Sequence, residues 1–221
     1  SNNAADICAT DIAVMDNGCC RFLLRVNLMS EHPALEKEIQ LSIPGIHAVS
    51  NALAAAACAL AAGADLAQIA AGLSSVAPIA GRLELKPLAN DNCIIDDSYN
   101  ASPSSFEAAI DVLANRSGRK ILVMGDMGEL GDDAVNLHWQ VGHYAQQAGI
   151  DALYAVGELS AHACEAFAGK HVENKILLAA LLEQELDAAN LDNSPITFLV
   201  KGSRSAGMET LVEHITTREE V

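Results

Sequence analysis

The alternation of apolar and polar positions changes character near Pro44. Before it, apolar and polar residues alternate in three short runs, at residues 12–15, 21–29 and 37–43. Polar turn sequences separate the runs at residues 16–18 and 31–33. Because alternation with a period of two places one face of each strand on a core, this segment is predicted to form a small antiparallel hairpin or meander.

Helical spacing replaces the alternation after Gly45. An Ala-rich helix is predicted to begin at residue 50 or 51 and to end at Gly63. Asp65 is followed three residues later by Gln68, which is the pattern of a capping box. A second helix is therefore predicted from Asp65 to about Gly72.

Beyond a break at residues 78–81 and an expected connector at residues 82–87, apolar strands alternate with amphipathic helices. Strands are predicted at residues 93–96, 120–124, 152–156 and 196–200, with a weaker one at 172–176. Helices are predicted at residues 103–115, 134–149, 160–168, 178–189 and 207–217. This order predicts an α/β fold, in which right-handed crossovers build a parallel sheet with helices on both faces.

Composition narrows the class of protein. With 221 residues and 51% apolar content, the chain is long and apolar enough to bury a proper core. The longest apolar run, at residues 52–62, is shorter than the roughly 20 residues that span a bilayer, so no membrane span is expected. The net charge of −16 repels phosphate backbones and argues against nucleic-acid binding. Six scattered cysteines without a CxxC pair indicate reduced thiols in the cytoplasm.

In a parallel sheet, ligands bind beyond the carboxyl ends of the strands, so the loops that follow strands are the candidate sites. Four such loops are expected, at residues 97–102, 125–131, 157–158 and 201–204. Asp96 and Asp97 could bind sugar hydroxyls or Mg²⁺, or Asp97 and Ser98 could simply cap and turn the chain. Lys201, Ser203 and Arg204 suit a phosphate or a carboxylate.

Other candidate residues carry weaker signals. Asn51 shares a helix face with His47 and either hydrogen-bonds an adenine edge or, as the pattern alone favours, caps its helix. The glycine-rich loop at residues 125–131 is not GxGxxG, and it is compatible with a simple tight turn. His138 lies in an amphipathic helix, where packing is a better explanation than catalysis.

Five segments, in order and spacing, resemble one family of Mur-type ligases. They are Gly45-Ile46-His47 with residues 51–55, Gly81-Arg82-Leu83-Glu84, residues 96–101, residues 125–131, and Lys201-Gly202-Ser203-Arg204. The family is that of the UDP-N-acetylmuramoyl-tripeptide D-alanyl-D-alanine ligases, called MurF, and the resemblance runs from about residue 6 to residue 215. Family members have three domains. The resemblance implies that residues 1–85 are the end of the central ATPase domain and residues 86–221 the Rossmann-like carboxy-terminal domain.

The resemblance also implies an activity. Such ligases transfer the γ-phosphoryl group of ATP, with Mg²⁺, to the carboxylate of UDP-N-acetylmuramoyl-tripeptide. D-alanyl-D-alanine then attacks the acyl phosphate, in the synthesis of peptidoglycan precursors. By resemblance, Asn51 contacts adenine, Arg82 approaches the phosphates as the catalytic cation, and Asp97 holds the ribose. The residues implied to face the dipeptide are Asn100, Lys201, Ser203 and Arg204. The full enzyme is expected to be cytoplasmic and monomeric.

Two departures from the family pattern are visible. Ala48 stands where family members commonly have asparagine, which weakens any second amide contact to the base. No GxxxxGK[ST] sequence occurs, and the Mg²⁺ ligands and modified lysine of the central domain are missing. The chain is therefore expected to hold half of an active site and to be inactive alone.

Three other functions stay open from the sequence. A related Mur-type ligase for a single amino acid is the nearest alternative. A receiver-type signalling module would also have paired acids like Asp96 and Asp97 and a lysine like Lys201, but it needs an acceptor aspartate where this chain has Gly157-Glu158. A non-catalytic, flavodoxin-like binding module is the third.

Overall fold

The computed structural model describes residues 6–15, 18–27 and 34–219, and the chain forms two compact units that divide between Pro78 and Ile79. This division falls before the expected boundary at residue 85. The turn residues expected at positions 16–17 and 31–33 lie outside the described residues. Each unit has its own hydrophobic core and is described by itself.

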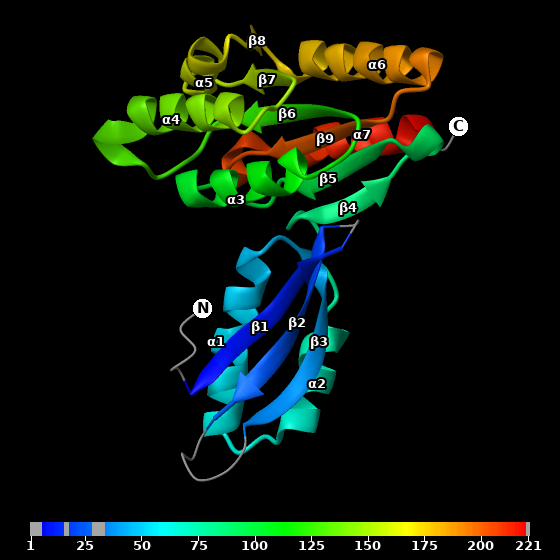
Figure 1. The fold of residues 1–221 in the computed structure, drawn as a ribbon. Helices are drawn as coiled ribbons and strands as arrows, with labels where there is room; N and C mark the ends of the chain where they lie inside the picture. The colour runs from blue at the N-terminus through cyan, green and yellow to red at the C-terminus, as the bar shows by residue number, and fades with distance from the viewer. Residues whose placement is uncertain (1–5, 16–17, 28–33, 220–221) are drawn as a thin grey trace. The chain divides into compact units, whose positions relative to one another are not determined.

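The first unit is a three-stranded antiparallel sheet with two helices on one face (Figure 1). Its elements, in chain order, are β1 (Ile7–Val14), β2 (Cys19–Val26), β3 (Leu35–Pro44), α1 (His47–Ala61) and α2 (Leu66–Ser75). Alternate residues of β2, including Phe22 and Leu24, are buried with Ile39 of β3 and Ile69 of α2. The predicted meander is confirmed.

The helix bounds in this unit correct two predictions. Helix α1 begins at His47 rather than at residue 50 or 51, because the chain turns at Gly45, whose φ of +96° ends the strand. The carbonyl of Gly45 then accepts the first backbone hydrogen bond, from Ala48 (3.1 Å), without any side-chain cap. Helix α2 has the predicted capping box at Asp65 but continues through Gly72 to Ser75.

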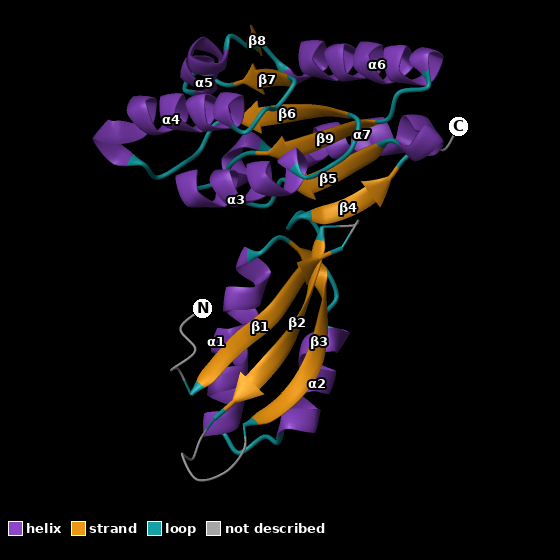
Figure 2. Ribbon diagram, in the orientation of Figure 1, coloured by secondary structure: helices purple, strands orange, loops and turns teal. Residues whose placement is uncertain are grey.

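The second unit is a six-stranded sheet in the order β4-β5-β9-β6-β7-β8, parallel except for the edge strand β4 (Figure 2). Its strands are β4 (Glu84–Pro87), β5 (Cys93–Asp97), β6 (Arg119–Gly125), β7 (Ala152–Val156), β8 (Lys170–Val172) and β9 (Ile196–Lys201). Its helices are α3 (Pro103–Ala114), α4 (Ala134–Gln147), α5 (Ser160–Phe167), α6 (Lys175–Asp192) and α7 (Glu209–Glu219). One core packs α3, α4 and α5 on one face, and another packs α6 and α7 on the other face. The predicted α/β fold is confirmed.

Two short strands differ from the sequence prediction. Residues 84–87, expected in a connector, form β4, which pairs antiparallel with β5 from Glu84 opposite Asp96 to Pro87 opposite Cys93. The weak strand expected at residues 172–176 lies earlier, at β8. It ends there because the side chain of Asn174 accepts a hydrogen bond from the Leu177 N–H (3.0 Å) and starts α6.

The strand order bears on the alternatives that the sequence left open. In a flavodoxin-like or receiver domain, the first parallel strand lies between the second and the third. Here the last strand, β9, lies between the first two parallel strands, β5 and β6. The second unit is therefore neither a receiver domain nor a flavodoxin-like module.

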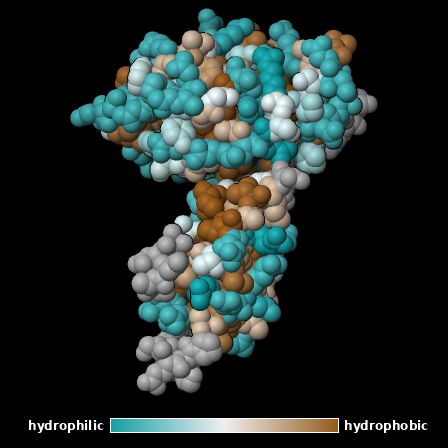
Figure 3. Space-filling model, viewed as in Figure 1, coloured by the Kyte–Doolittle hydropathy of each residue, from teal (hydrophilic) through white to brown (hydrophobic). Residues whose placement is uncertain are grey.

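Figure 3 shows hydrophilic side chains over most of the visible face of the second unit. Within residues 6–15, 18–27 and 34–219, no helix has the length and apolarity that a membrane crossing requires. All six cysteines are free of disulfide bonds.

Candidate functional site

The carboxyl ends of β5, β9, β6 and β7 bring four loops together along one edge of the second unit's sheet (Figure 1). These are the four loops predicted from the sequence. Hydrogen bonds join them: the backbone N–H of Ser203 donates to the carbonyl of Asp126 (2.8 Å). The carboxylate of Asp126 accepts in turn from the N–H of Ser160 (2.7 Å) and from its hydroxyl. The edge is a single bonded surface rather than four independent turns.

A buried ion pair lies where two of these loops meet. The ammonium of Lys201 donates to Oδ2 of Asp97 and to the carbonyl of Asn100 (2.9 Å), and its side chain is only 2% exposed. The other carboxylate oxygen, Oδ1, accepts from the N–H of Leu83 (3.0 Å). Burial raises the pKa of Asp97 and lowers the pKa of Lys201, and each charge opposes the shift of the other. Lys201 thus points into the unit and joins three chain segments.

This placement changes how two predicted site residues are understood. Lys201 was predicted to face the dipeptide, but its ammonium is buried against Asp97 and the Asn100 carbonyl. Asp97 was predicted to bind the ribose, and both of its carboxylate oxygens already accept a bond from within the unit. The two ligand roles stay predictions, and the observed role of the pair is to hold the loop.

Two arginines lie near one aromatic ring at the same edge of the sheet. The guanidinium carbon of Arg82 lies 4.3 Å from the centre of the Tyr99 ring, and that of Arg204 lies 5.8 Å from it. Tyr99 is 44% exposed, and the side chain of Arg204 is 69% exposed with an ion pair to Glu209 (Nη1–Oε1, 3.5 Å). The structure therefore brings together Arg82 and Arg204, two of the predicted residues, through a tyrosine that the sequence reasoning left without a role.

The backbone on both sides of Arg82 is fixed to the end of β5. The carbonyl of Gly81 accepts from the N–H of Tyr99 (3.0 Å), and the N–H of Leu83 donates to Asp97 (3.0 Å). Gly81 has a φ of +71°, and a Cβ there would lie 3.2 Å from the Tyr99 nitrogen. Glycine is needed at this position because the backbones pass so closely.

Asp96 forms a turn with Ser98, one of the two residues for which the sequence left a turn-forming role open. Its Oδ1 accepts from the Ser98 hydroxyl (2.6 Å) and the Ser98 N–H (3.2 Å), and its Oδ2 lies 4.0 Å from the ammonium of Lys86. Both acids at the end of β5 are thus partnered inside the unit. Among the residues that the structure describes, no group of three or more histidine, cysteine, aspartate or glutamate side chains is arranged to hold a metal ion.

His138 supports the glycine-rich loop and is fully buried, as its position in an amphipathic helix predicted. Its Nε2 accepts from the N–H of Met127 (2.9 Å), and its Nδ1 donates to the carbonyl of Ala134 (2.7 Å). Burial lowers the pKa of His138, so the ring stays neutral and keeps the tautomer that this pair of bonds requires. It is a packing and positioning residue.

The remaining predicted residues lie in different settings. Asn100 is exposed, and its side-chain oxygen accepts from the N–H of Ala101 (2.8 Å). Ser203 is buried, with its hydroxyl 3.1 Å from that of Ser205. Asn51 belongs to the first unit, where it is exposed on α1.

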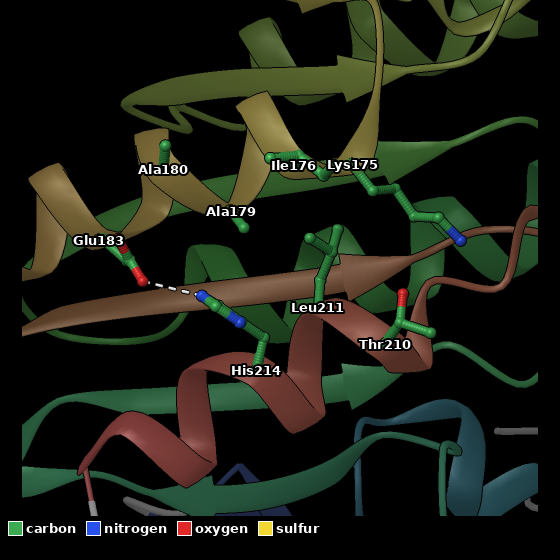
Figure 4. Close-up of a pocket in the computed structure, with 8 residues that line it drawn as sticks. All are labelled: Lys175, Ile176, Ala179, Ala180, Glu183, Thr210, Leu211 and His214. Atoms are coloured by element: carbon green, nitrogen blue, oxygen red, sulfur yellow. Dashed lines mark hydrogen bonds and ion pairs between the residues drawn. The ribbon is translucent and has the colours of Figure 1, made fainter.

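A groove of about 350 Å³ lies elsewhere in the second unit, between α6 and α7 (Figure 4). Ala179, Ala180 and Leu211 line it, and a hydrogen bond between Nε2 of His214 and Oε1 of Glu183 (2.8 Å) lies across it. None of the predicted site residues lines this groove.

Comparison with known proteins identifies relatives of this chain. Residues 81–204 match the family model described as Mur ligase, glutamate ligase domain. The UDP-N-acetylmuramoyl-tripeptide–D-alanyl-D-alanine ligase of Escherichia coli K12 is 41% identical over 216 residues, covering 96% of this chain and 45% of that protein. The corresponding ligase of Haemophilus influenzae is 38% identical, covering 81% of this chain and 39% of that protein.

Solved structures show the same fold. A crystal structure of MurF from Acinetobacter baumannii superposes with a TM-score of 0.86 at 32% identity, covering 98% of this chain and 46% of that one. MurF from Thermotoga maritima, solved in complex with ADP, has a TM-score of 0.76 at 22% identity, over 99% of this chain and 48% of that one. The chain thus spans about half the length of the relatives it matches. The family model covers more than half of the sequence, and the chain belongs to the Mur ligase family.

Proposed function

We propose that this chain is part of an ATP-dependent ligase that adds D-alanyl-D-alanine to UDP-N-acetylmuramoyl-tripeptide. One observation carries the proposal: the match to the Escherichia coli ligase extends over 216 residues and includes residues of both compact units. The named activity belongs to that relative, of which this chain spans 45%. A related ligase for a single amino acid remains the alternative that an experiment must separate.

The chemistry asks for cations at the site. A carboxylate is a poor electrophile, and ATP would supply the phosphoryl group that activates it. Arg82 and Arg204, which share the Tyr99 ring, fit such an anionic ligand because a guanidinium binds phosphate and carboxylate oxygens with two donors. From the family resemblance, we assign the Mg²⁺ ligands mainly to the part of the ligase that this chain does not contain.

Each side chain then has a proposed task. Asn51 contacts the adenine, Asp97 the ribose, and Arg82 stabilises charge on the phosphoryl group as it moves. Asn100 and Arg204, which are exposed, face the dipeptide. Lys201 and Ser203 were also predicted to face the dipeptide, and because both are buried we propose that they serve this region by holding its loops.

The remaining assignments follow from the family. We assign residues 1–85 to the end of the ATPase domain and residues 86–221 to the carboxy-terminal domain, although the family match begins earlier, at residue 81. We also place the whole enzyme in the cytoplasm and expect it to act as a monomer.

The test uses the longer protein that contains this chain together with its upstream region. It is supplied with ATP, Mg²⁺, the UDP-linked tripeptide and either D-alanyl-D-alanine or single amino acids, and ADP release and product mass are followed. We expect a product that contains the dipeptide when D-alanyl-D-alanine is supplied, and no product when single amino acids are supplied. Turnover with a single amino acid but not with the dipeptide would replace the proposal with the alternative ligase.

Arg82→Ala and Arg82→Lys in that protein test the proposed role of this residue. We expect Arg82→Ala to lower kcat more than it weakens ATP binding, because its charge matters most in the transition state. Arg82→Lys should recover little of the lost kcat, since an ammonium group does not replace the bidentate hydrogen bonding of a guanidinium. Full rescue by lysine would show that only charge matters.

A further inference from the structure

We propose that His138 is a positioning residue of the carboxyl edge: its neutral ring fixes the glycine-rich loop at Met127, and this loop in turn holds the backbone that carries Arg204. His138 belongs to α4, and its side chain is fully buried. It therefore acts on the edge only through the groups that it contacts, and these are backbone groups of two neighbouring segments.

The two partners of the ring fix where its proton lies. Nδ1 of His138 lies 2.7 Å from the carbonyl oxygen of Ala134, which can only accept a hydrogen bond, so Nδ1 carries the proton. Nε2 lies 2.9 Å from the backbone nitrogen of Met127, which can only donate, so Nε2 is the unprotonated acceptor. Neither partner can reverse its role, as a rotating hydroxyl could. A second proton on the ring would place two N–H groups against each other and remove the bond to the loop.

The Met127 N–H has no replacement for this acceptor. His138 is 0% exposed and Met127 is 2% exposed, so water does not take the place of the ring. A buried N–H that loses its acceptor keeps the full penalty of its desolvation. The loop at residues 125–131 therefore depends on the neutral ring for its conformation at Met127.

The residue before Met127 connects this loop to the end of β9. The carbonyl of Asp126 accepts from the N–H of Ser203 (2.8 Å). Ser203 is buried and precedes the 3₁₀ turn Arg204–Ala206, and its carbonyl accepts from the N–H of Ala206 (3.0 Å) to close that turn. A shift of the loop backbone is thus passed to the turn by one hydrogen bond.

The charged groups around the ring do not replace its bond to the loop. Burial lowers the pKa of His138, the Ala134 carbonyl and the Asp126 carboxylate oppose this shift, and His162 of α5 adds to it. The Asp126 carboxylate accepts from the N–H and the hydroxyl of Ser160. The other acids on the elements that pack against α4 are exposed, and they are Asp132 and Asp133 on the turn before it, Glu107 and Asp111 on α3, and Glu165 on α5.

The direction of the pKa shift gives the direction of the pH dependence. Because the pKa of His138 lies below its ordinary value of 6.5, the bond to Met127 is intact above pH 6.5 and is lost as the pH falls. The effect on catalysis rests on the proposed function, in which Arg204 faces the dipeptide, whereas the effect on the backbone does not.

The first measurement uses the chain as it stands. Long-range ¹⁵N–¹H correlation spectra of the imidazole rings show which nitrogen of His138 carries the proton, and at pH 8 we expect a proton on Nδ1 and none on Nε2. The amide signals of Met127, Ser203 and Arg204 are then followed as the pH is lowered. We expect all three to shift with the midpoint of the His138 ring, below pH 6.5.

Two amide variants separate the bond to Met127 from general packing. Glutamine places its side-chain oxygen near the position of Nε2 and can accept from Met127, whereas asparagine reaches only as far as Nδ1. At pH 8, His138→Gln should keep the Ser203 and Arg204 signals of the parent and remove their pH dependence, while His138→Asn should shift them. His143→Gln, on the same helix, is the control and should leave these signals and their pH dependence unchanged.

The same variants in the longer protein connect the loop to the reaction. His138→Asn should raise the KM for D-alanyl-D-alanine about three- to tenfold, because a buried N–H of the loop has lost its acceptor, and should leave the KM for ATP within about twofold. His138→Gln should keep the parent's KM for the dipeptide at pH 8. A general loss of stability would instead lower the activity without separating the two substrates.

Each result supports or overturns the proposal. A proton on Nε2 in the parent, or Ser203 and Arg204 signals that are equal in His138→Asn and the parent, would overturn it. The parent titration and the variant spectra are independent, so each decides the question if unfolding prevents the other. Shifted signals with an unchanged KM for the dipeptide would overturn the part of His138 in dipeptide binding. Because the spectra need no catalysis, a longer protein that fails to ligate the dipeptide would overturn the proposed function and leave the role of His138 in the loop standing.

Discussion

At the scale of single residues, the main feature of the site is the buried ion pair between Asp97 and Lys201. A buried ion pair costs desolvation, but removing one partner leaves the other charge buried and uncompensated. We therefore predict that Lys201→Met lowers the free energy of unfolding of the second unit by about 3 kcal/mol or more. Trp139 is the only tryptophan of the sequence and lies on α4, so its fluorescence during urea unfolding reports on this unit.

Two further variants make this prediction specific. Lys170→Met, at an exposed lysine of β8, should change the stability by less than about 0.5 kcal/mol. The double variant Asp97→Asn with Lys201→Met should recover part of the loss, because the unpaired charge is then gone. If Lys201→Met unfolds at the same urea concentration as the parent, the buried pair does not stabilise the loop.

The hydroxyl of Tyr154 is expected to make the stability of the second unit depend on pH in the alkaline range. It donates to Glu185, and burial with this hydrogen bond raises the pKa of Tyr154 from 10.0 to about 12. The unfolded chain releases the proton near pH 10 and the folded chain retains it to about pH 12, so this group's contribution to stability is lost as the pH rises through that window.

Tyr154→Phe should accordingly make the fall of unfolding free energy between pH 9 and pH 11 shallower than in the parent, measured by urea unfolding at each pH. Lysines and the other tyrosines titrate in both proteins and cancel in the comparison. Tyr144, whose pKa is also raised to about 12, chiefly by its bond to Asp111, should behave in the same direction when changed to phenylalanine. Parallel curves for parent and Tyr154→Phe would remove Tyr154 as the cause.

The sequence located the site better than it oriented the side chains in it. Loops at strand ends follow from the order of strands and helices, and all four are at the predicted edge. The direction of Lys201 could not be predicted, because all residues of β9 are buried and no alternation distinguishes its two faces. The role of Tyr99 depends on Arg204, which lies far away in the sequence and reaches the ring only through strand pairing.

At the scale of elements, long regular segments were predicted well and short ones poorly. Strand β7 has the predicted bounds, and β5, β6 and β9 differ from theirs by one residue at one or both ends, whereas β1 begins five residues before the alternating run at residues 12–15. Strand β4 was missed because Glu84-Leu85-Lys86-Pro87 has no strand pattern of its own, and its conformation is fixed by pairing with β5. Local sequence cannot report a hydrogen-bond partner that comes later in the chain.

Changing glycine to alanine is expected to have opposite effects on stability at two helical positions. Gly142 of α4 packs directly on α5, and a Cβ there would overlap the backbone carbonyl of Ala163. Gly72 of α2 is exposed, and a Cβ there would have nothing within 4 Å. Gly142→Ala should destabilise the second unit by about 2 kcal/mol, because the helices must separate, whereas Gly72→Ala should stabilise the first by about 0.5–1 kcal/mol.

Each effect is measured by thermal unfolding, with Trp139 fluorescence for Gly142→Ala and far-ultraviolet circular dichroism for Gly72→Ala. Alanine favours a helix more than glycine does at both positions, so this general preference cannot explain opposite effects of the two variants. A rise in the unfolding midpoint for both variants would mean that α4 and α5 are not held at the close approach seen in the structure.

At the scale of the whole molecule, the two units have separate cores. The buried cluster of the first unit contains residues up to Ala70, and the two clusters of the second unit begin at Leu83 and at Ile94. We predict that residues 79–221 fold when produced alone. Amide spectra of this piece should superpose on those of the intact chain for β5 to α7, and collapsed, broadened signals would show that its fold depends on the first unit.

The last prediction concerns turnover by the chain itself. Arg82 and Arg204 supply cations, but most of the binding energy for a triphosphate comes from a nest of backbone amides and from Mg²⁺, and the sequence has no GxxxxGK[ST] loop. The 221-residue chain, given ATP, Mg²⁺, the UDP-linked tripeptide and D-alanyl-D-alanine, is therefore expected to release no ADP above a protein-free control. The positive control is the longer protein in the same mixture, and preparations must be free of host ligase. Steady ADP release that is lost in Arg82→Ala would show that these residues already contain a complete triphosphate site.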